Sequence, residues 1–259
     1  MQASAGTLPF DLDFSGKTAL VTGAAHGIGL AISRQLRSCG ARVLGLDKDA
    51  DALAAAFPDA ADRIVADAAA EDPVALGSRI VAEHGTIPLL VNNVGVTTPS
   101  GFLELEPADF DLVFATNLRT PWFLTRELVR ALVAAETGGA ILFVSSVHQA
   151  ALRLHPHYSA SKAAVALLVK ELAHELAPHR IRVNSVAPGW IRTEDRPDPE
   201  HERELVRLIP AGRGGEPEDV ARVATILLSD EACGYVTGAS VTIDGGLSLH
   251  SWVMDLPGS

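Results

Sequence analysis

A tyrosine and a lysine stand four residues apart, at Tyr158 and Lys162, in the segment HYSASKAAVALLVKELAHEL. Apolar residues recur in this segment at helical spacing, so both side chains are expected on one face of one helix. A tyrosine with its ordinary pKa of about 10 is a poor base at neutral pH, but a nearby ammonium group favours the phenolate. The pair therefore predicts an acid–base centre in which Tyr158 exchanges a proton with a substrate hydroxyl.

Two serines follow the apolar run AILFV and precede this pair in the chain. Ser145 stands thirteen residues before Tyr158, and Ser146 stands twelve before it. A hydroxyl that donates to the substrate oxygen beside Tyr158 would position the substrate and stabilise developing charge. Either serine could supply this donor.

Glycines separate the first apolar run, KTALVT, from a helical segment, at Gly23, Gly27 and Gly29. Glycine permits positive φ and lets the backbone approach a pyrophosphate bound at a helix N-terminus. The next apolar run, ARVLGLD, ends in Asp47, about where a carboxylate would accept hydrogen bonds from adenosine ribose hydroxyls. Asp47 would repel the additional phosphate of NADP, whereas Lys48 could receive it. NAD is the predicted cofactor, with NADP as the alternative.

The elements that must position these groups follow an alternating pattern. From Lys17 onward, short apolar runs alternate with longer segments of helical period. Runs such as AILFVSS are apolar on both faces, as strands covered by helices on each side require. The pattern predicts an α/β protein with a single-domain Rossmann fold, in which helices cover both faces of a doubly wound parallel sheet of about seven strands. The expected strands are KTALVT, ARVLGLD, RIVAD, PLLVNN, AILFVSS, RIRVNSVAP and ASVTID.

The chain shows no internal repeat and no linker typical of a domain boundary. Residues 1–14 lack periodicity and are expected to form a flexible lead-in, followed by one dinucleotide-binding and catalytic domain over residues 15–259. The charge-rich stretch at 194–210 has two interpretations, a solvated loop that runs into a helix or a mobile lid over the substrate.

Composition excludes several classes of protein. The 259 residues contain 32 acidic and 21 basic side chains, a net charge of −11, which disfavours binding to nucleic acid or to anionic membranes. No apolar run is long enough to span a bilayer. Cys39 and Cys233 are too few for a disulfide framework, and no cluster of metal ligands is apparent. These features predict a cytoplasmic protein without a metal site.

The motifs in this order resemble those of the short-chain dehydrogenase/reductase family, from about Lys17 to Leu247. The resemblance implies an NAD-dependent enzyme that interconverts a small secondary alcohol and a ketone by hydride transfer, with Tyr158 as general acid/base. The alternatives are an NADPH-dependent ketoreductase on the same fold and a nucleotide-binding sensor without catalysis. The motifs are TGAAHGIG at 22–29, Asp67, NNVG at 92–95, Asn117 in FATNL, Ser145 with Ser146, YSASK at 158–162, NSVAPGWIRT ending at Thr193, and GYVTGASVTIDGG.

The resemblance also implies individual roles. Asp67 would bind the adenine amine, and the segment from Pro188 to Thr193 would hold the nicotinamide carboxamide. Asn117 would mark a helix irregularity whose carbonyl holds a water beside Lys162, although it could also be a polar helix residue that faces outward. The implied cofactor-binding residues are Gly23, His26, Gly27, Ile28, Gly29, Asp47, Asp67, Ala68, Asn93, Gly95, Tyr158, Lys162, Pro188, Gly189, Ile191 and Thr193.

Two features of the family pattern favour different serines as the catalytic one. A count of thirteen residues before Tyr158 favours Ser145, whereas the local match of FVSSVHQ to the family's strand end favours Ser146. Ser146 is preferred, because a loop absorbs a one-residue deletion more easily than a buried strand changes register. The predicted catalytic residues are Asn117, Ser146, Tyr158 and Lys162.

The resemblance implies a homotetramer, or at least a homodimer, built by pairing the helices that contain Asn117 and Tyr158 and by packing the C-terminal strand region against a partner. The helix that begins near Tyr158 carries more apolar residues than one stripe against a sheet requires. A partner would cover the second apolar face, and Leu168 is expected to lie in that interface.

Overall fold

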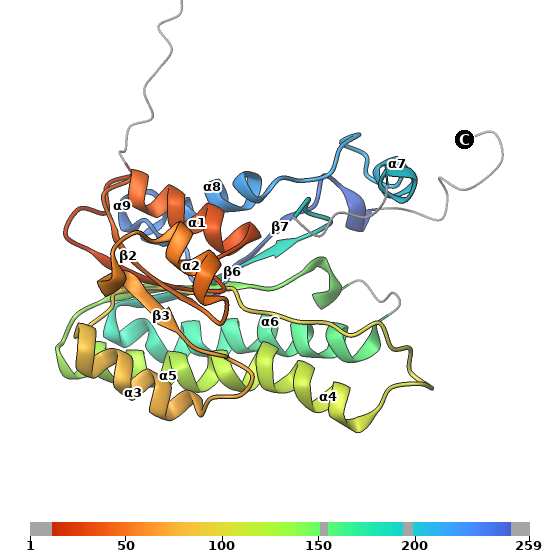
Figure 1. Cartoon of the computed structure of the whole chain (residues 1–259). Helices are drawn as coiled ribbons and strands as arrows, with labels where there is room; N and C mark the ends of the chain where they lie inside the picture. Colours follow the sequence, from red (N-terminus) through yellow and green to blue (C-terminus); the bar gives the residue numbers. More distant parts are fainter. Residues whose placement is uncertain (1–11, 151–154, 194–198, 250–259) are drawn as a thin grey trace, which may run out of the picture.

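The computed structural model describes residues 12–150, 155–193 and 199–249 of the chain (Figure 1). Seven strands form one sheet in the order β3-β2-β1-β4-β5-β6-β7, and all neighbouring strands are parallel. Each apolar run that was expected to form a strand does so, and the predicted α/β fold is confirmed. The strands are β1 (Thr18–Thr22), β2 (Arg42–Asp47), β3 (Arg63–Val65), β4 (Leu89–Asn92), β5 (Gly139–Val144), β6 (Ile181–Pro188) and β7 (Ser240–Ile243).

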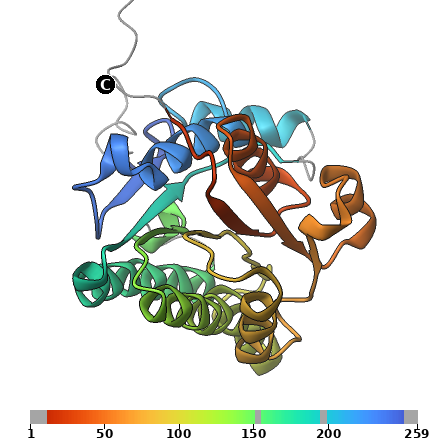
Figure 2. The same ribbon diagram turned by 90° about the vertical axis from the view of Figure 1, so that its left-hand side faces the viewer.

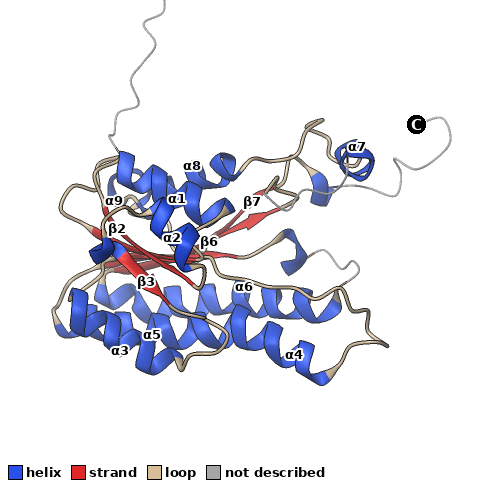
Figure 3. Cartoon of the chain, viewed as in Figure 1, coloured by secondary structure: helices blue, strands red, loops and turns tan. Residues whose placement is uncertain are grey.

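Helices cover both faces of the sheet (Figure 2). They are α1 (Gly27–Ser38), α2 (Ala50–Ala56), α3 (Pro73–His84), α4 (Pro107–Phe114), α5 (Thr120–Ala134), α6 (Pro156–Leu176), α7 (Pro199–Arg207), α8 (Pro217–Leu228) and α9 (Asp230–Cys233). Helices α3, α4, α5 and α6 lie on one face, and α1, α2 and α8 lie on the other (Figure 3). A wider helical turn, Ala115–Arg119, joins α4 to α5, and single turns lie at Ala60–Asp62, Val147–Gln149, Ala177–His179 and Leu247–Leu249.

The strand β5 shows why both faces had to be apolar. Ala140, Leu142 and Val144 point into the core shared with α1 and α8. Ile141 and Phe143 point into the core shared with α3, α5 and α6. Side chains of a strand alternate between faces, so a strand buried between two helical layers needs apolar residues at every position.

The chain order of the strands creates a crevice at the carboxyl edge of the sheet. β1 lies between β2 and β4, so the connections on its two sides run in opposite directions. In open parallel sheets, ligands bind outside the carboxyl ends of the strands at such a switch point. The glycine turn after β1 and the NNVG segment at the end of β4 face this position.

Two predicted boundaries can be compared with the structure. Residues 1–11 of the predicted lead-in lie outside the described residues. Phe14, which was also placed in the lead-in, is buried with 1% of its surface exposed, and its N–H donates to the Cys39 carbonyl at 2.7 Å. Packing therefore begins before the predicted boundary. Of the stretch 194–210, residues 194–198 lie outside the described residues, and 199–207 form α7.

The prediction that Leu168 lies in a subunit interface is wrong. Leu168 is 5% exposed and belongs to the core beneath its own sheet. On the same helix, Leu167 is 60% exposed, and Ala160 and Ala163 are exposed as well. α6 therefore has a second, exposed apolar face, but Leu167 lies on it and Leu168 does not. Successive residues of a helix point in directions about 100° apart. Within the described ranges, no helix is long and apolar enough to cross a membrane.

Candidate active site

The turn between β1 and α1 depends on its glycines. Gly23 and Gly27 have φ values of 65° and 49°, a region that favours glycine. A Cβ atom on Gly29 would lie 2.0 Å from the Gly23 carbonyl oxygen, so helix and turn could not approach as they do. A Cβ on Gly27 would lie 3.2 Å from the Thr193 methyl group. The N–H groups at the start of α1 are thus left open to a ligand, as an anion site at a helix N-terminus requires.

The end of β4 holds this turn in place. The Asn93 side chain donates from Nδ2 to the carbonyls of Thr22 and Gly23, at 3.0 and 3.1 Å. The Thr22 hydroxyl in turn accepts from the N–H groups of Asn93 and Val94, at 2.9 and 3.1 Å. Thr22 was not among the predicted site residues, although it is the first residue of the motif TGAAHGIG.

Asp47 ends β2 and faces the same turn. Its Oδ2 accepts from the Ala25 N–H at 3.0 Å, and its Oδ1 accepts from the Asp49 N–H at 3.1 Å. Nearby, the His26 ring lies 3.0 Å from the Asp49 carboxylate. The backbone N–H of Ala52, helped by His26, holds the pKa of Asp49 below its ordinary value. Acidic groups therefore dominate the end of β2.

A cavity of about 670 Å³ lies over the carboxyl ends of β1 to β4. Asp67 and Ala68 line it after β3, and the exposed Lys48 lines it after β2. Thr116 also lines it, and its buried hydroxyl has no hydrogen-bond partner within the described part of the chain. A buried polar atom of this kind is expected to bond a ligand or water. The glycine turn, Asp47 and Thr116 together fit the adenosine and pyrophosphate of a dinucleotide.

A second cavity of about 500 Å³ adjoins the first and shares Ile28, Asn93, Gly95 and Thr193 with it. Its wall contains the side chains that could do chemistry. The residues that line it and were expected from the sequence are Ile28, Asn93, Gly95, Ser145, Ser146, Tyr158, Lys162, Pro188, Gly189, Ile191 and Thr193.

Lys162 is buried, and its Nζ donates to the Val144 carbonyl at 2.9 Å and lies 5.6 Å from the centre of the Tyr158 ring. Burial lowers the pKa of Lys162 to about 8. Burial also raises the pKa of the Tyr158 hydroxyl, and a hydrogen bond with Ser146 opposes this shift. Burial is thus the largest influence on the Tyr158 pKa in this structure, and the lowering of that pKa by Lys162 stays a prediction.

The two serines at the end of β5 differ in their partners. The Ser145 hydroxyl is turned to the backbone and donates to the Lys162 carbonyl at 3.3 Å. The Ser146 hydroxyl accepts from the His148 N–H at 3.2 Å and is the one within reach of the Tyr158 hydroxyl. This geometry favours Ser146 as the donor to a substrate oxygen.

Asn117 lies in the wider turn between α4 and α5 and is 2% exposed, so it does not face outward. Its Oδ1 accepts from the Val96 N–H at 2.8 Å, and its Nδ2 donates to the Val96 carbonyl and to the Ser161 hydroxyl, at 2.9 and 3.0 Å. The helical hydrogen-bond pattern widens over Ala115–Arg119, as the predicted irregularity requires. Asn117 thus joins this turn to α6 and to the loop after β4.

The structure brings the predicted site residues together around the two cavities. Two of them do not line either cavity: Gly29 packs under the turn, and Asn117 lies behind Gly95 and Lys162. Thr116 and Arg192 were not among the predicted site residues, although each lies inside a quoted motif, FATNL and NSVAPGWIRT. Arg192 lines the second cavity and pairs with Glu202 on α7 and Glu216 before α8, at 2.6 and 3.1 Å.

Known proteins are similar over nearly the whole chain. A family model described as enoyl-(acyl carrier protein) reductase matches residues 23–248. A 3-oxoacyl-(acyl-carrier-protein) reductase from Thermotoga maritima is 38% identical over 247 residues, which are 90% of this chain and 98% of that protein. The L-rhamnose 1-dehydrogenase (NAD(P)(+)) of Azotobacter vinelandii is 38% identical over 255 residues, 90% of this chain and 97% of that protein.

The crystal structure of a gluconate 5-dehydrogenase from Burkholderia cenocepacia, in complex with NADP and tartrate, matches with a TM-score of 0.85. The two chains are 29% identical, and the match covers 93% of this chain and 98% of that one. The similarity therefore extends through both cavities.

Proposed function

The chain belongs to the short-chain dehydrogenase/reductase family of oxidoreductases, and we propose that it interconverts a secondary alcohol and a ketone with NAD as cofactor. The observation that carries this proposal is the meeting of Tyr158, Ser146 and Lys162 in one cavity, beside the cavity whose lining fits the adenosine and pyrophosphate of a dinucleotide. Membership among enzymes that act on CH–OH or keto groups sets aside the alternative of a sensor without catalysis.

In ketone reduction, the Tyr158 hydroxyl gives its proton to the substrate oxygen and regains one from solvent. In alcohol oxidation, Tyr158 first releases its own proton toward solvent, along the path described below for Asn117 and Lys162, and its oxygen then takes the proton of the substrate hydroxyl. The Ser146 hydroxyl donates to the substrate oxygen and holds it beside Tyr158. Lys162 keeps a positive charge close to the tyrosine while Val144 fixes its position. The bound nicotinamide supplies the carbon that accepts or gives the hydride.

Asn117 contributes through its position. It connects the wider turn to Ser161, the neighbour of Lys162, and to the backbone of Val96. As the family resemblance implies, a backbone carbonyl that the wider turn leaves without its helical hydrogen bond would hold a water molecule beside Lys162. That water would carry protons between Lys162 and solvent. Gly23, Gly27, Asp47 and Thr116 would hold the adenosine half of the cofactor, and the segment from Pro188 to Thr193 would hold the nicotinamide half.

A second possibility is an NADPH-dependent ketoreductase. Lys48 lines the adenosine end of the cavity, and the gluconate 5-dehydrogenase structure contains NADP. Asp47 argues for NAD, because its carboxylate would lie close to the additional phosphate. The cofactor choice therefore depends on whether Asp47 or Lys48 dominates.

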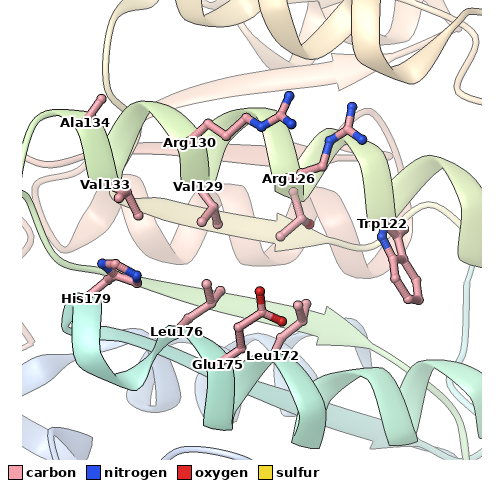
Figure 4. Close-up of a pocket in the computed structure, with 11 residues that line it drawn as sticks. Trp122, Arg126, Val129, Arg130, Val133, Ala134, Leu172, Glu175, Leu176 and His179 are labelled. Carbon is pink, nitrogen blue, oxygen red and sulfur yellow. The ribbon is translucent and has the colours of Figure 1, made fainter.

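We further propose that α5 and α6 form a homodimer interface within a homotetramer. A groove of about 560 Å³ lies between these helices, and Val129, Val133, Leu172 and Leu176 form much of its wall (Figure 4). At one end lies Trp122, which is 46% exposed. Exposed apolar surface of this kind is typical of protein interfaces. The expected cytoplasmic location agrees with two free cysteines.

The decisive experiment compares the two tyrosines of the chain. Purified protein is given NAD and a panel of secondary alcohols that includes neutral sugars, sugar acids and 3-hydroxyacyl thioesters, and reduced cofactor is followed by its absorbance. Tyr158→Phe should abolish turnover and leave NAD binding unchanged, because it removes the hydroxyl and keeps the ring. Tyr235→Phe is the matched control, since Tyr235 is fully exposed outside both cavities. Activity of Tyr158→Phe within about tenfold of wild type would refute the mechanism.

A further inference from the structure

His148 lies in the single turn that follows Ser146, and the mechanism above does not use it. Its ring meets the Tyr158 ring edge to face, with centroids 5.4 Å apart and planes at 73°. Its Nδ1 lies 3.1 Å from the hydroxyl of Ser159, the residue after Tyr158 on α6. Its backbone N–H donates to the Ser146 hydroxyl at 3.2 Å. One residue thus contacts both groups that would handle the substrate oxygen.

We propose that the His148 side chain is a positioning residue that fixes the Tyr158 ring beside the Ser146 hydroxyl, which the backbone N–H of the same residue holds in place. The proposal rests on the proposed function, in which Tyr158 and Ser146 act on the same substrate oxygen. It adds a residue that need not touch the substrate itself.

The contact with Ser146 sets the direction of a hydroxyl. A serine hydroxyl has one proton to donate and two lone pairs to accept with. The His148 N–H occupies one lone pair, so the Ser146 proton remains available to the side facing Tyr158 and the cavity. A donor that is oriented before the substrate arrives needs no reorganisation during the reaction.

The contact with Tyr158 sets the direction of a ring. Edge-to-face packing is a favoured geometry of aromatic pairs, and it opposes rotation of Tyr158 away from Ser146. The imidazole is held in turn by Ser159, which is 3% exposed and lies on the rigid helix α6. Tyr158, Ser159 and His148 thus form a short closed loop of contacts.

The surroundings of the His148 ring favour its neutral form. Burial, followed by the proximity of His155, lowers the pKa of His148, and the His155 ring centre lies 6.5 Å away. Among the residues that the structure describes, the titratable side chains whose rings face His148 are His155 and Tyr158. A neutral imidazole has one nitrogen that donates and one that accepts, which suits a fixed bond to the Ser159 hydroxyl.

The test uses three variants in the full-length enzyme. His148→Phe keeps an aromatic ring of similar size but loses the bond to Ser159, Ser159→Ala removes the partner alone, and His148→Ala removes the ring. Misplacement of a reacting group by about 1 Å can cost roughly 100-fold, so His148→Ala should lower kcat by roughly 10- to 100-fold. NAD affinity, measured by titration calorimetry, should not change. His174→Ala is the control, since His174 is an exposed histidine on α6, the helix that carries Tyr158.

Two further readouts separate positioning from a general structural role. The pH dependence of kcat should shift in His148→Ala, because the surroundings of the Tyr158 hydroxyl change, and should not shift in His174→Ala. His148→Phe and Ser159→Ala should each cause a smaller loss, and the double variant should be no worse than His148→Phe, since both remove the same hydrogen bond.

A kcat and a pH profile of His148→Ala within about twofold of wild type would overturn the proposal. So would a loss confined to the KM for substrate, or additive losses in the double variant. If His148→Ala does not fold, His148→Phe, Ser159→Ala and their double variant still test whether the bond between His148 and Ser159 affects kcat. Failure of the proposed function would appear separately, as turnover that survives Tyr158→Phe.

Discussion

The Lys162 ammonium group donates to the carbonyl of Val144, the last residue of β5, at 2.9 Å. The next two residues are Ser145 and Ser146, so one strand end both anchors the lysine and presents the serines. Tyr158 lies one helical turn before Lys162 on α6. Together with the bond from the Ser145 hydroxyl to the Lys162 carbonyl, this hydrogen bond ties the end of β5 to α6 and so holds Ser146 near Tyr158.

Lys162→Met should increase stability while it destroys activity. Burial lowers the lysine pKa from 10.5 to about 8 in the folded protein, so between these values the unfolded chain binds more protons. The free energy of unfolding of the wild-type protein therefore rises as the pH increases from about 8 to 10.5, where the buried lysine loses its charge. At pH 7 the lysine is charged, and its burial lowers the free energy of unfolding by the full amount. Its removal should stabilise the cofactor-free protein by roughly 1–2 kcal/mol, after a deduction for the unpartnered Val144 carbonyl.

Urea unfolding at pH 7 and at pH 10 would measure this effect. The difference in free energy of unfolding between Lys162→Met and wild type should be smaller at the higher pH, because the wild-type lysine is largely uncharged there. Destabilisation of similar size at both values would mean that packing of the lysine stem, and not its charge, dominates.

The two serines should differ in what their removal changes. Ser146→Ala should lower kcat by roughly 100-fold, in line with removal of one oriented donor from a site. Ser145→Ala should mainly reduce stability, because its hydroxyl is bonded to the Lys162 carbonyl and not to the cavity. Steady-state kinetics and thermal unfolding of both variants would decide, and the reverse ranking would assign the catalytic donor to Ser145.

Cofactor choice should respond to charge at the end of β2. Asp47→Asn keeps an oxygen that can accept from the Ala25 N–H but removes the negative charge. The ratio of kcat/KM for NAD to that for NADP should exceed one in wild type and fall by roughly tenfold in this variant. Lys48→Ala is the control, since removal of this positive charge should raise the same ratio. A wild-type enzyme that prefers NADP, and loses that preference in Lys48→Ala, would show that the lysine controls the choice.

The fold and the site differ in how far local sequence determines them. The run AILFVSS has to be a doubly covered strand, because its residues feed two cores, and Gly29 has to be glycine because a Cβ would strike the Gly23 carbonyl. These features follow from neighbours along the chain. Neighbours along the chain do not show which of Leu167 and Leu168 is buried, since this depends on how α6 is rotated against the sheet.

Roles that depend on three-dimensional surroundings were harder to predict. The raised pKa of Tyr158 arises from burial, which spacing to Lys162 does not report. The orphan hydroxyl of Thr116 becomes visible only when the wider turn brings it to the cavity wall. The choice of Ser146 over Ser145 rested on the resemblance, and the structure supports it through the different partners of the two hydroxyls.

The last prediction concerns assembly through α5 and α6. Leu167→Asp should reduce the oligomer, because it places a charge on the exposed apolar face of α6 without disturbing the core. Light scattering of wild type should give two or four times the 27.2 kDa of one chain, and Leu167→Asp should give a smaller mass at unchanged helical content. Val65→Asp is the matched control, since Val65 is 52% exposed on the edge strand β3. A wild-type mass of one chain would refute the oligomer, and a mass unchanged by Leu167→Asp would place the interface elsewhere.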